Sequence, residues 1–98
     1  MTTTMNTSTE AAVELLALLG GCANIAADAE YCATRLRVTV GDVHAVRGHA
    51  LHDHRIVHGV IKRPGRELDI VVGHRVSATL ALLINVAVAE TLAEAEQA

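Results

Sequence analysis

A cysteine and two arginines stand close together in the stretch EYCATRLRVTV, which runs from Glu30 to Val40. Cys32 is one of two cysteines in the chain, and Arg35 and Arg37 follow it by three and five residues. The thiolate is the nucleophilic form of cysteine, and an unperturbed thiol with a pKa of about 8.5 is mostly protonated at pH 7. Cations within about 4–6 Å lower the pKa of such an acid by about 1–3 units. The spacing allows a reactive thiolate at Cys32, supported by two guanidinium groups. Taken alone, a free cysteine is more often a partly buried structural thiol, and arginines on an exposed strand face are usually solvated.

The residues that follow Cys32 alternate between two kinds of side chain. A period of two is typical of a half-buried strand, and the residues expected on the buried face are Thr34, Leu36, Val38 and Val40. Arg35 and Arg37 then lie together on the opposite face. A brief strand within residues 24–30 is expected to precede this one. Cys32 would thus lie in the connection of a hairpin.

Hydrophobic spacing and turn residues predict seven elements along the chain. The order is helix, strand, strand, helix, strand, strand, helix, at residues 7–19, 24–30, 34–40, 43–54, 55–61, 68–72 and 77–95. Gly20 and Gly21 end the first helix, and Pro64 and Gly65 form the turn between the last two strands. This order favours an α+β fold, a mostly antiparallel four-stranded sheet with helices packed on one face, as in a split sandwich. Residues 1–7 are expected to form a disordered tail, and residues 8–98 a single domain.

The composition excludes several classes of function. The net charge is −3, and seven arginines accompany a single lysine without the basic stripe that binds nucleic acid. Tyr31 is the only residue among Phe, Trp and Tyr, so a stacking platform for a base or a sugar ring is lacking. The first residues have neither a basic start nor an apolar run, which favours the reducing cytosol and free thiols. The uncharged run from Val76 to Ala89 has 14 residues, fewer than the about 18–20 that cross a bilayer.

One block of the sequence is specific, and several shorter pieces accompany it in order. The block is Cys32-Ala33-Thr34-Arg35-Leu36-Arg37. The other pieces, between Val13 and Gly73, are a helix that ends in Gly-Gly, Asn24-Ile25, a turn at Asp42, Gly59-Val60 and a last strand closed by Gly73. Together they resemble the enzyme IIB component of the phosphoenolpyruvate-dependent sugar phosphotransferase system. The nearest branch is the glucose, N-acetylglucosamine and β-glucoside superfamily.

This resemblance implies that Cys32 accepts a phosphoryl group from a phosphohistidine of the IIA component and transfers it to a sugar. The sugar is held by the membrane-embedded IIC component, so the domain would be cytoplasmic and lie at the inner face of the membrane. Arg35 and Arg37 correspond to arginines implicated in the transfer to sugar, for which planar guanidinium donors are well suited. The phosphoryl-binding loop would be completed by Tyr31, Ala33 and Thr34. The scheme requires no metal and no organic cofactor.

Two residues depart from the family pattern near this site. A glutamine is common at the position of Asp69 in the last strand, and small or polar residues are common at the position of Tyr31. A carboxylate would repel an incoming phosphate unless it points away or pairs with an arginine such as Arg66. The departures leave room for an altered sugar preference or a weakened catalyst.

Histidines offer an alternative chemistry, because five of them lie within fifteen residues: His44, His49, His52, His54 and His58. Zinc prefers such ligands, and Cys32 could join them, although no pair has the tight spacing of a recognised metal motif. The alternative to a phosphocarrier is therefore a non-catalytic module of the same fold, either a regulator or a metal or redox sensor. Cys22 matches no motif and is assigned no chemistry.

The last predicted helix is apolar nearly all round as far as Val88 and is acidic at Glu90, Glu94 and Glu96. Such a helix has to bury a second face besides the one that contacts the sheet. The sequence leaves two coverings open. One is a second copy of the chain, which would give a homo-oligomer, and the other is the membrane partner.

Overall fold

The computed structural model describes residues 7–97, with side-chain environments for residues 8–95. Its elements are α1 (Thr7–Leu18), η1 (Cys22–Asn24), β1 (Glu30–Cys32), β2 (Arg35–Thr39), η2 (Val43–Ala45), α2 (Gly48–His52), β3 (Gly59–Lys62), β4 (Glu67–Val71) and α3 (Ser77–Gln97), where η denotes a 3-10 helix. The predicted tail, residues 1–7, lies outside the described residues apart from Thr7, which is the first residue of α1.

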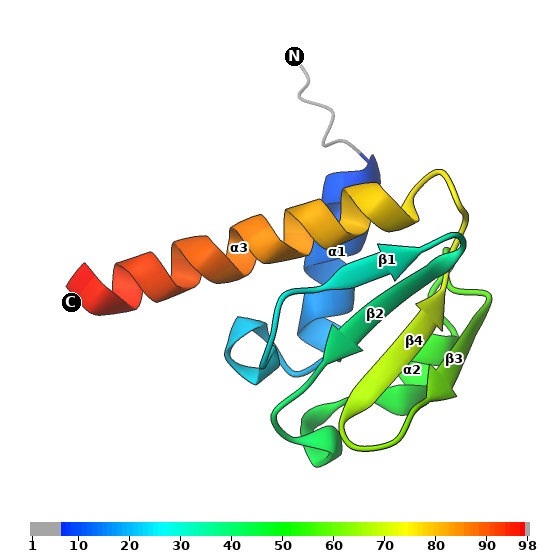
Figure 1. Cartoon of the computed structure of the whole chain (residues 1–98), viewed down its shortest axis with the longest axis horizontal. Helices are drawn as coiled ribbons and strands as arrows, with labels where there is room; N and C mark the ends of the chain where they lie inside the picture. The colour runs from blue at the N-terminus through cyan, green and yellow to red at the C-terminus, as the bar shows by residue number, and fades with distance from the viewer. Residues whose placement is uncertain (1–6, 98) are drawn as a thin grey trace.

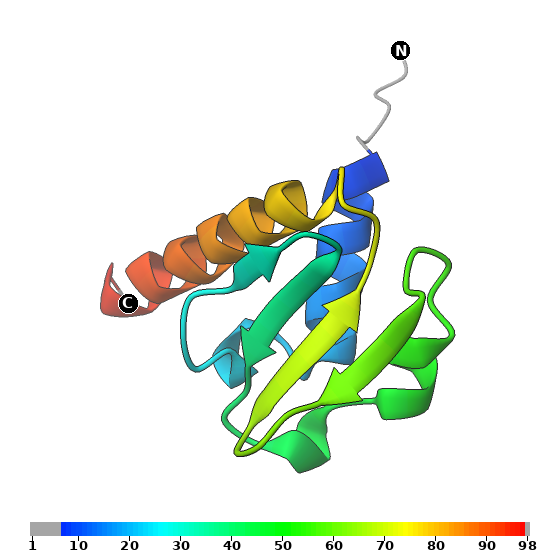
Figure 2. The same cartoon turned by 45° about the vertical axis from the view of Figure 1, so that its right-hand side comes forward.

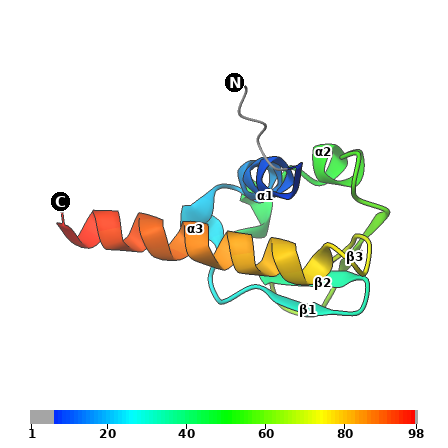
Figure 3. The same cartoon turned by 90° about the horizontal axis from the view of Figure 1, so that it is seen from above.

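The four strands form one antiparallel sheet in the order β1-β2-β4-β3. The three α-helices lie on one face of this sheet and leave the other face open (Figure 3). On β2, Leu36 and Val38 are fully buried beneath the helices, while Arg35 and Arg37 point to the open face and remain partly or largely exposed. The predicted α+β fold class is confirmed, and so is the alternation of residues 35–40. Thr34 was predicted on the buried face but is exposed, because it lies in the turn before β2.

Two predicted strand boundaries are wrong. The segment 24–30 forms no strand of its own, since Ile25 makes only an isolated bridge with Val40. The strand is Glu30–Cys32 instead, so Cys32 ends β1 and does not lie in the hairpin connection. The strand predicted at 55–61 begins only at Gly59, because the backbone N–H of Val57 bonds the carbonyl of His54 at 3.0 Å and closes a turn there.

The helix predicted over residues 43–54 is divided into η2 and α2. The reason lies at the residues between them, where Val46 and Arg47 adopt non-helical backbone angles. The N–H of Arg47 bonds the carbonyl of Leu18 at 2.8 Å. The N–H of Arg47 is therefore bonded to a free carbonyl at the end of α1. It cannot also form the hydrogen bond that would continue a helix from η2 into α2.

The core lies between the helices and the covered face of the sheet. Its fully buried large side chains come from the three α-helices, the residue after α1 and the two central strands, and include Leu15, Leu19, Leu36, Leu51, Ile70, Leu80 and Ile84. Burial of each such side chain stabilises the fold by about 1.5–3 kcal/mol. The two central strands are therefore the rigid part of the sheet, and β1 is an edge strand bonded to β2 alone.

The end of α1 is fixed to the loop after β2 by one buried side chain. Gly20 and Gly21 have φ values of 105° and 90°, and the N–H of Gly21 bonds the carbonyl of Leu16 at 2.8 Å, as in a Schellman cap. A Cβ at Gly20 would lie 2.7 Å from the amide nitrogen of Asn24. That amide donates to the carbonyl of Leu19 at 2.7 Å and to that of Asp42 at 3.0 Å, and its oxygen accepts from the N–H of Asp42 at 2.8 Å.

The helix α3 is longer than the body of the domain requires. Its first half packs on α1, β1 and β2, and its second half projects beyond the sheet (Figures 1 and 2). The stretch Ser77–Ala95, with a mean hydropathy of 1.5, is long and apolar enough to cross a membrane by length and composition alone, and 17% of that window is buried in the protein. This window is longer than the uncharged run of 14 residues because it includes Glu90 and Glu94.

The Asn24→Ala variant is expected to lose about 2–3 kcal/mol of unfolding free energy, because it removes three hydrogen bonds and leaves buried backbone groups unpaired. Urea unfolding followed by far-UV circular dichroism measures the change. The Asp28→Ala variant, at an exposed position on the following loop, should stay within about 0.5 kcal/mol of the parent. Equal stability of the two variants would contradict the role given to Asn24.

Candidate functional site

The β1–β2 hairpin presents Cys32 at the end of an edge strand. Cys32 is a free, exposed thiol, and it lies opposite Arg35 in the register of the two strands. Only Ala33 and Thr34 connect the strands, and Ala33 has a φ of 53°, in the left-handed region that two-residue hairpins require. A residue other than glycine is strained there by about 1–2 kcal/mol. The turn therefore has to be held in place by its surroundings.

Side chains of α3 hold this hairpin at both ends of β1. The buried hydroxyl of Ser77 donates to the carbonyl of Ala33 at 2.7 Å. The side chain of Asn85 accepts from the N–H of Ala29 at 2.7 Å and donates to the carbonyl of the same residue at 3.0 Å. The N–H of Val72 adds a bond to the carbonyl of Thr34 at 2.8 Å. Sequence reasoning missed Ser77 and Asn85, and the signal was their polarity within an otherwise apolar helix.

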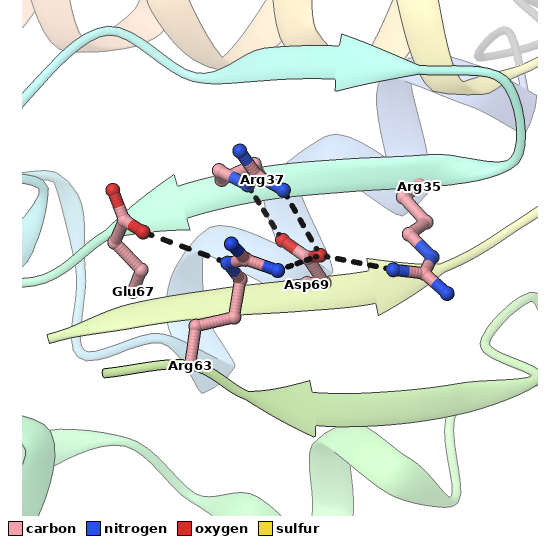
Figure 4. Close-up of polar contacts among 5 residues, drawn as sticks. All are labelled: Arg35, Arg37, Arg63, Glu67 and Asp69. Carbon is pink, nitrogen blue, oxygen red and sulfur yellow. Dashed lines mark hydrogen bonds and ion pairs between the residues drawn. The ribbon is translucent and has the colours of Figure 1, made fainter. Parts of the chain in front are cut away.

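The open face of the sheet carries a cluster of charges around a buried carboxylate (Figure 4). Asp69 of β4 is fully buried and accepts two hydrogen bonds from Arg37, at 2.8 Å from Nε and 3.3 Å from the terminal nitrogen. Arg35 approaches the same carboxylate at 3.5 Å and Arg63 approaches it at 3.6 Å. Glu67 lies 3.6 Å from Arg63. Three guanidinium groups therefore share one buried carboxylate.

These contacts stabilise the ionised form of Asp69. The hydrogen bond from Arg37 is the largest influence and holds the pKa of the carboxyl below its ordinary value of 3.8, against the opposing effect of burial. The charges of Arg37, Arg63 and Arg35 lower the pKa further. The same hydrogen bond raises the pKa of Arg37, which stays a cation at any ordinary pH.

The expected pairing of Asp69 with an arginine is present, but the predicted partner was wrong. Arg66 donates to the carbonyl of Gly41 at 3.2 Å instead. The reason is register, since Arg37 lies directly opposite Asp69 across β2 and β4 while Arg66 precedes β4.

Within the part of the chain that the structure describes, neither Arg35 nor Arg37 makes a hydrogen bond to Cys32.

A small hollow nevertheless joins the thiol to the arginines. It has a volume of about 80 Å³ and is lined by Glu30, Tyr31, Cys32, Arg35 and Arg37. Pockets for free small molecules usually measure about 300–1,000 Å³, so this one suits a group carried on the sulfur better than a whole sugar. A larger hollow of about 430 Å³ lies between η2 and the β3–β4 turn, and its lining includes none of the predicted site residues.

Among residues 7–97, no three side chains of His, Cys, Asp or Glu gather as a metal site would require. His54 has a local structural contact instead, because its Nε2 lies 2.7 Å from the Glu14 carboxylate, which also accepts from Arg55 at 2.8 Å. These two contacts connect the end of α2 to α1.

Comparison with known proteins gives two matches and one negative result. Residues 13–46 match the family described as phosphotransferase system, EIIB. The fold is similar to a crystal structure of one domain of the PTS system IIabc component from Clostridium difficile, with a TM-score of 0.65 and 23% sequence identity over 79% of each chain. No curated protein sequence matches the chain significantly.

The matched segment contains the second half of α1, Asn24 and the whole β1–β2 hairpin, so it includes the residues predicted to carry or bind the phosphoryl group. Which sugar superfamily is nearest stays a prediction. The predicted resemblance to EIIB of the phosphotransferase system is confirmed in the sequence of residues 13–46, and the fold is similar to one domain of a PTS IIabc component.

Proposed function

We propose that this chain is a phosphocarrier in sugar uptake, in which Cys32 carries a phosphoryl group between two other proteins. The donor would be a phosphohistidine on a IIA component, and the acceptor would be a hydroxyl of a sugar held by a membrane-embedded IIC component. The domain would work in the cytoplasm, at the inner face of the membrane. The observation that carries the proposal is the exposed thiol of Cys32, in register with Arg35 and inside the segment that matches EIIB domains.

Two displacements at phosphorus make up the reaction. In the first, the thiolate attacks phosphorus, the S–P bond forms, and the P–N bond breaks with its electron pair returning to the donor imidazole. In the second, the sugar hydroxyl oxygen attacks phosphorus, its proton passes to water, and the S–P bond breaks with its electron pair returning to sulfur as the thiolate. Both displacements need in-line approach and neutralisation of the oxygens in transfer. Exposure of the end of β1 leaves room for each partner in turn.

The two arginines differ in how firmly Asp69 holds them. Arg37 makes two hydrogen bonds to the carboxylate and 35% of its side chain is exposed. Arg35 makes one contact at 3.5 Å and 48% of its side chain is exposed. A phosphoryl group on Cys32 would attract Arg35 first, because Arg35 lies opposite the cysteine and would give up a single, longer contact with Asp69. Arg37 would remain as a fixed positive charge beside the hollow.

Asp69 sets the charge that the hollow presents. Its carboxylate offsets part of the charge of three guanidinium groups, so the resting thiol faces a weaker positive field than three free arginines would give. A phosphoryl group carries about two negative charges near neutral pH and accepts several hydrogen bonds. It can therefore compete with Asp69 for Arg35.

The second candidate is a regulatory domain of the same fold that does not transfer phosphate. The observation that favours it is the direction of the guanidinium groups of Arg35 and Arg37 toward Asp69. The two candidates differ in a single outcome, which is whether the thiol accepts a phosphoryl group from a donor.

The parent protein, incubated with a phosphorylated IIA component, is expected to gain the mass of one phosphoryl group. The Cys32→Ser variant should gain none, because it lacks the acceptor sulfur. The Cys22→Ser variant is the matched control, since it removes the other free thiol, and it should be labelled like the parent. Intact-mass spectrometry measures all three. An unlabelled parent supports the regulatory candidate.

Replacement of Arg35 or Arg37 by glutamine is expected to slow the release of the phosphoryl group to sugar by about 10²- to 10³-fold, as loss of a preorganised donor does in other transfer reactions. Single-turnover transfer from the isolated phosphorylated domain to membranes that contain a IIC permease measures this step alone. Arg66→Gln is the control, because the Arg66 side chain donates to the carbonyl of Gly41, outside the cluster. Equal rates for the three variants would exclude this role for Arg35 and Arg37.

The Asp69→Asn variant is expected to change how stability depends on pH. Because the folded-state pKa of Asp69 is lowered, its ionised form stabilises the fold above the ordinary value of 3.8, and this contribution is lost as pH falls below that value. The parent should therefore lose more unfolding free energy between about pH 5 and pH 3 than the variant does. Urea titrations at several pH values measure it, with Glu67→Gln as a control. Parallel curves for parent and Asp69→Asn would contradict the assignment.

A further inference from the structure

A line of exposed side chains runs along α3 on the side away from the core. We call it the outer seam and define it as Thr79, Leu82, Val86, Ala89 and Ala93, all of which are exposed. Leu82 is 63% exposed and Val86 is 46% exposed, the largest apolar groups of the seam. At 100° per residue the seam lies opposite the side chains that α3 buries, which are Ser77, Leu80, Ala81 and Ile84.

We propose that the outer seam binds the outer seam of a second copy of this chain, with the two α3 helices antiparallel. The seam residues alternate in steps of three and four, which is the spacing of the a and d positions in a coiled coil. The seam continues onto the half of α3 that stands clear of the other elements in two views (Figures 1 and 2). A second helix can therefore lie along it.

Side-chain volumes favour the antiparallel direction. When the helices are aligned so that Val86 of one copy faces Ala89 of the other, Leu82 faces Ala93 of the other copy. Each large side chain of one helix then lies against a small side chain of the other, so the facing side chains can pack without a gap. A parallel alignment would place Leu82 against Leu82 and leave the layers of Ala89 and Ala93 loosely filled.

Charge favours the same direction. Glu90 and Glu94 lie near the C-terminal end of α3, no lysine or arginine occurs in residues 77–97, and Arg75 precedes the helix. In the antiparallel alignment, Glu94 of one copy lies level with Ala81 in the second turn of α3 in the other copy, near the positive end of that helix dipole. A two-fold axis makes this match at both ends of the pair. A parallel pair would bring the acidic ends together.

A bilayer is a poorer occupant for the seam. Helices that bind membrane surfaces carry lysine and arginine on their polar face, whereas the charged residues of α3 are acidic and are repelled by anionic headgroups. Insertion across the bilayer would also break the hydrogen bonds of Ser77 and Asn85 to the β1 segment. The proposal is independent of phosphoryl transfer, because pairing needs no phosphate on Cys32.

Sedimentation equilibrium of the full chain between about 10 μM and about 1 mM tests the pairing, since a single helix pair forms a small interface of modest affinity. The average mass is expected to rise from 10.3 kDa toward twice that value. Leu82→Glu should weaken association at least about tenfold, while Val13→Glu, at a 57% exposed position on α1, should associate like the parent. A monomeric parent throughout, or equal association of Leu82→Glu, would overturn the proposal.

Cysteine cross-linking tests the direction. Leu82→Cys and Ala93→Cys are made separately in a background without Cys22 and Cys32, mixed and oxidised. The expected product joins the two different variants, and a dominant link between two Leu82→Cys chains would overturn the antiparallel arrangement. Vesicles of phosphatidylcholine with phosphatidylserine provide the last comparison. Binding of the monomer to them that Leu82→Glu abolishes would assign the seam to a membrane instead.

Discussion

The position of the thiol depends on how an edge strand is held. β1 is three residues long and pairs only with β2, so its own ladder is too short to fix it firmly. Ser77 and Asn85 of α3 supply the remaining bonds, at Ala33 and Ala29. The lengths agree, because eight residues of helix rise about 12 Å and four residues of strand span about 13 Å. The helix thus acts as a template for the strand that ends in Cys32.

A second constraint is the buried charge of Asp69. A carboxylate without exposure to water is tolerated only when it is paired and hydrogen-bonded, and Arg37 with its two neighbours meets that need on the open face of the sheet. The same guanidinium groups are the ones that a phosphoryl group on Cys32 would use. Under the proposed function, the stabilising ion pair and the transfer site would share residues, and Arg35 is the member best able to serve both.

Much of this arrangement could be predicted from local patterns in the sequence. The period of two along β2 gave the faces of Leu36 and Arg37 correctly, and the glycine pair gave the end of α1. Boundaries were wrong where a distant backbone group decided them, as when the carbonyl of Leu18 captures the N–H of Arg47 and divides a helix. The partners of Asp69 follow from strand register, which no local pattern specifies. Asn85 and Ser77 were missed because an isolated polar residue in an apolar helix does not reveal what it bonds.

The central claim is that the sulfur of Cys32 carries phosphorus. Phosphorus-31 NMR of the intact domain after incubation with a phosphorylated IIA component tests it most directly, because phosphorus bonded to sulfur, nitrogen or oxygen resonates in separate regions. The account predicts one new resonance in the region of phosphorus bonded to sulfur, absent after alkylation of the thiol. A resonance from phosphorus bonded to nitrogen or oxygen of this chain, or no new resonance, would contradict it.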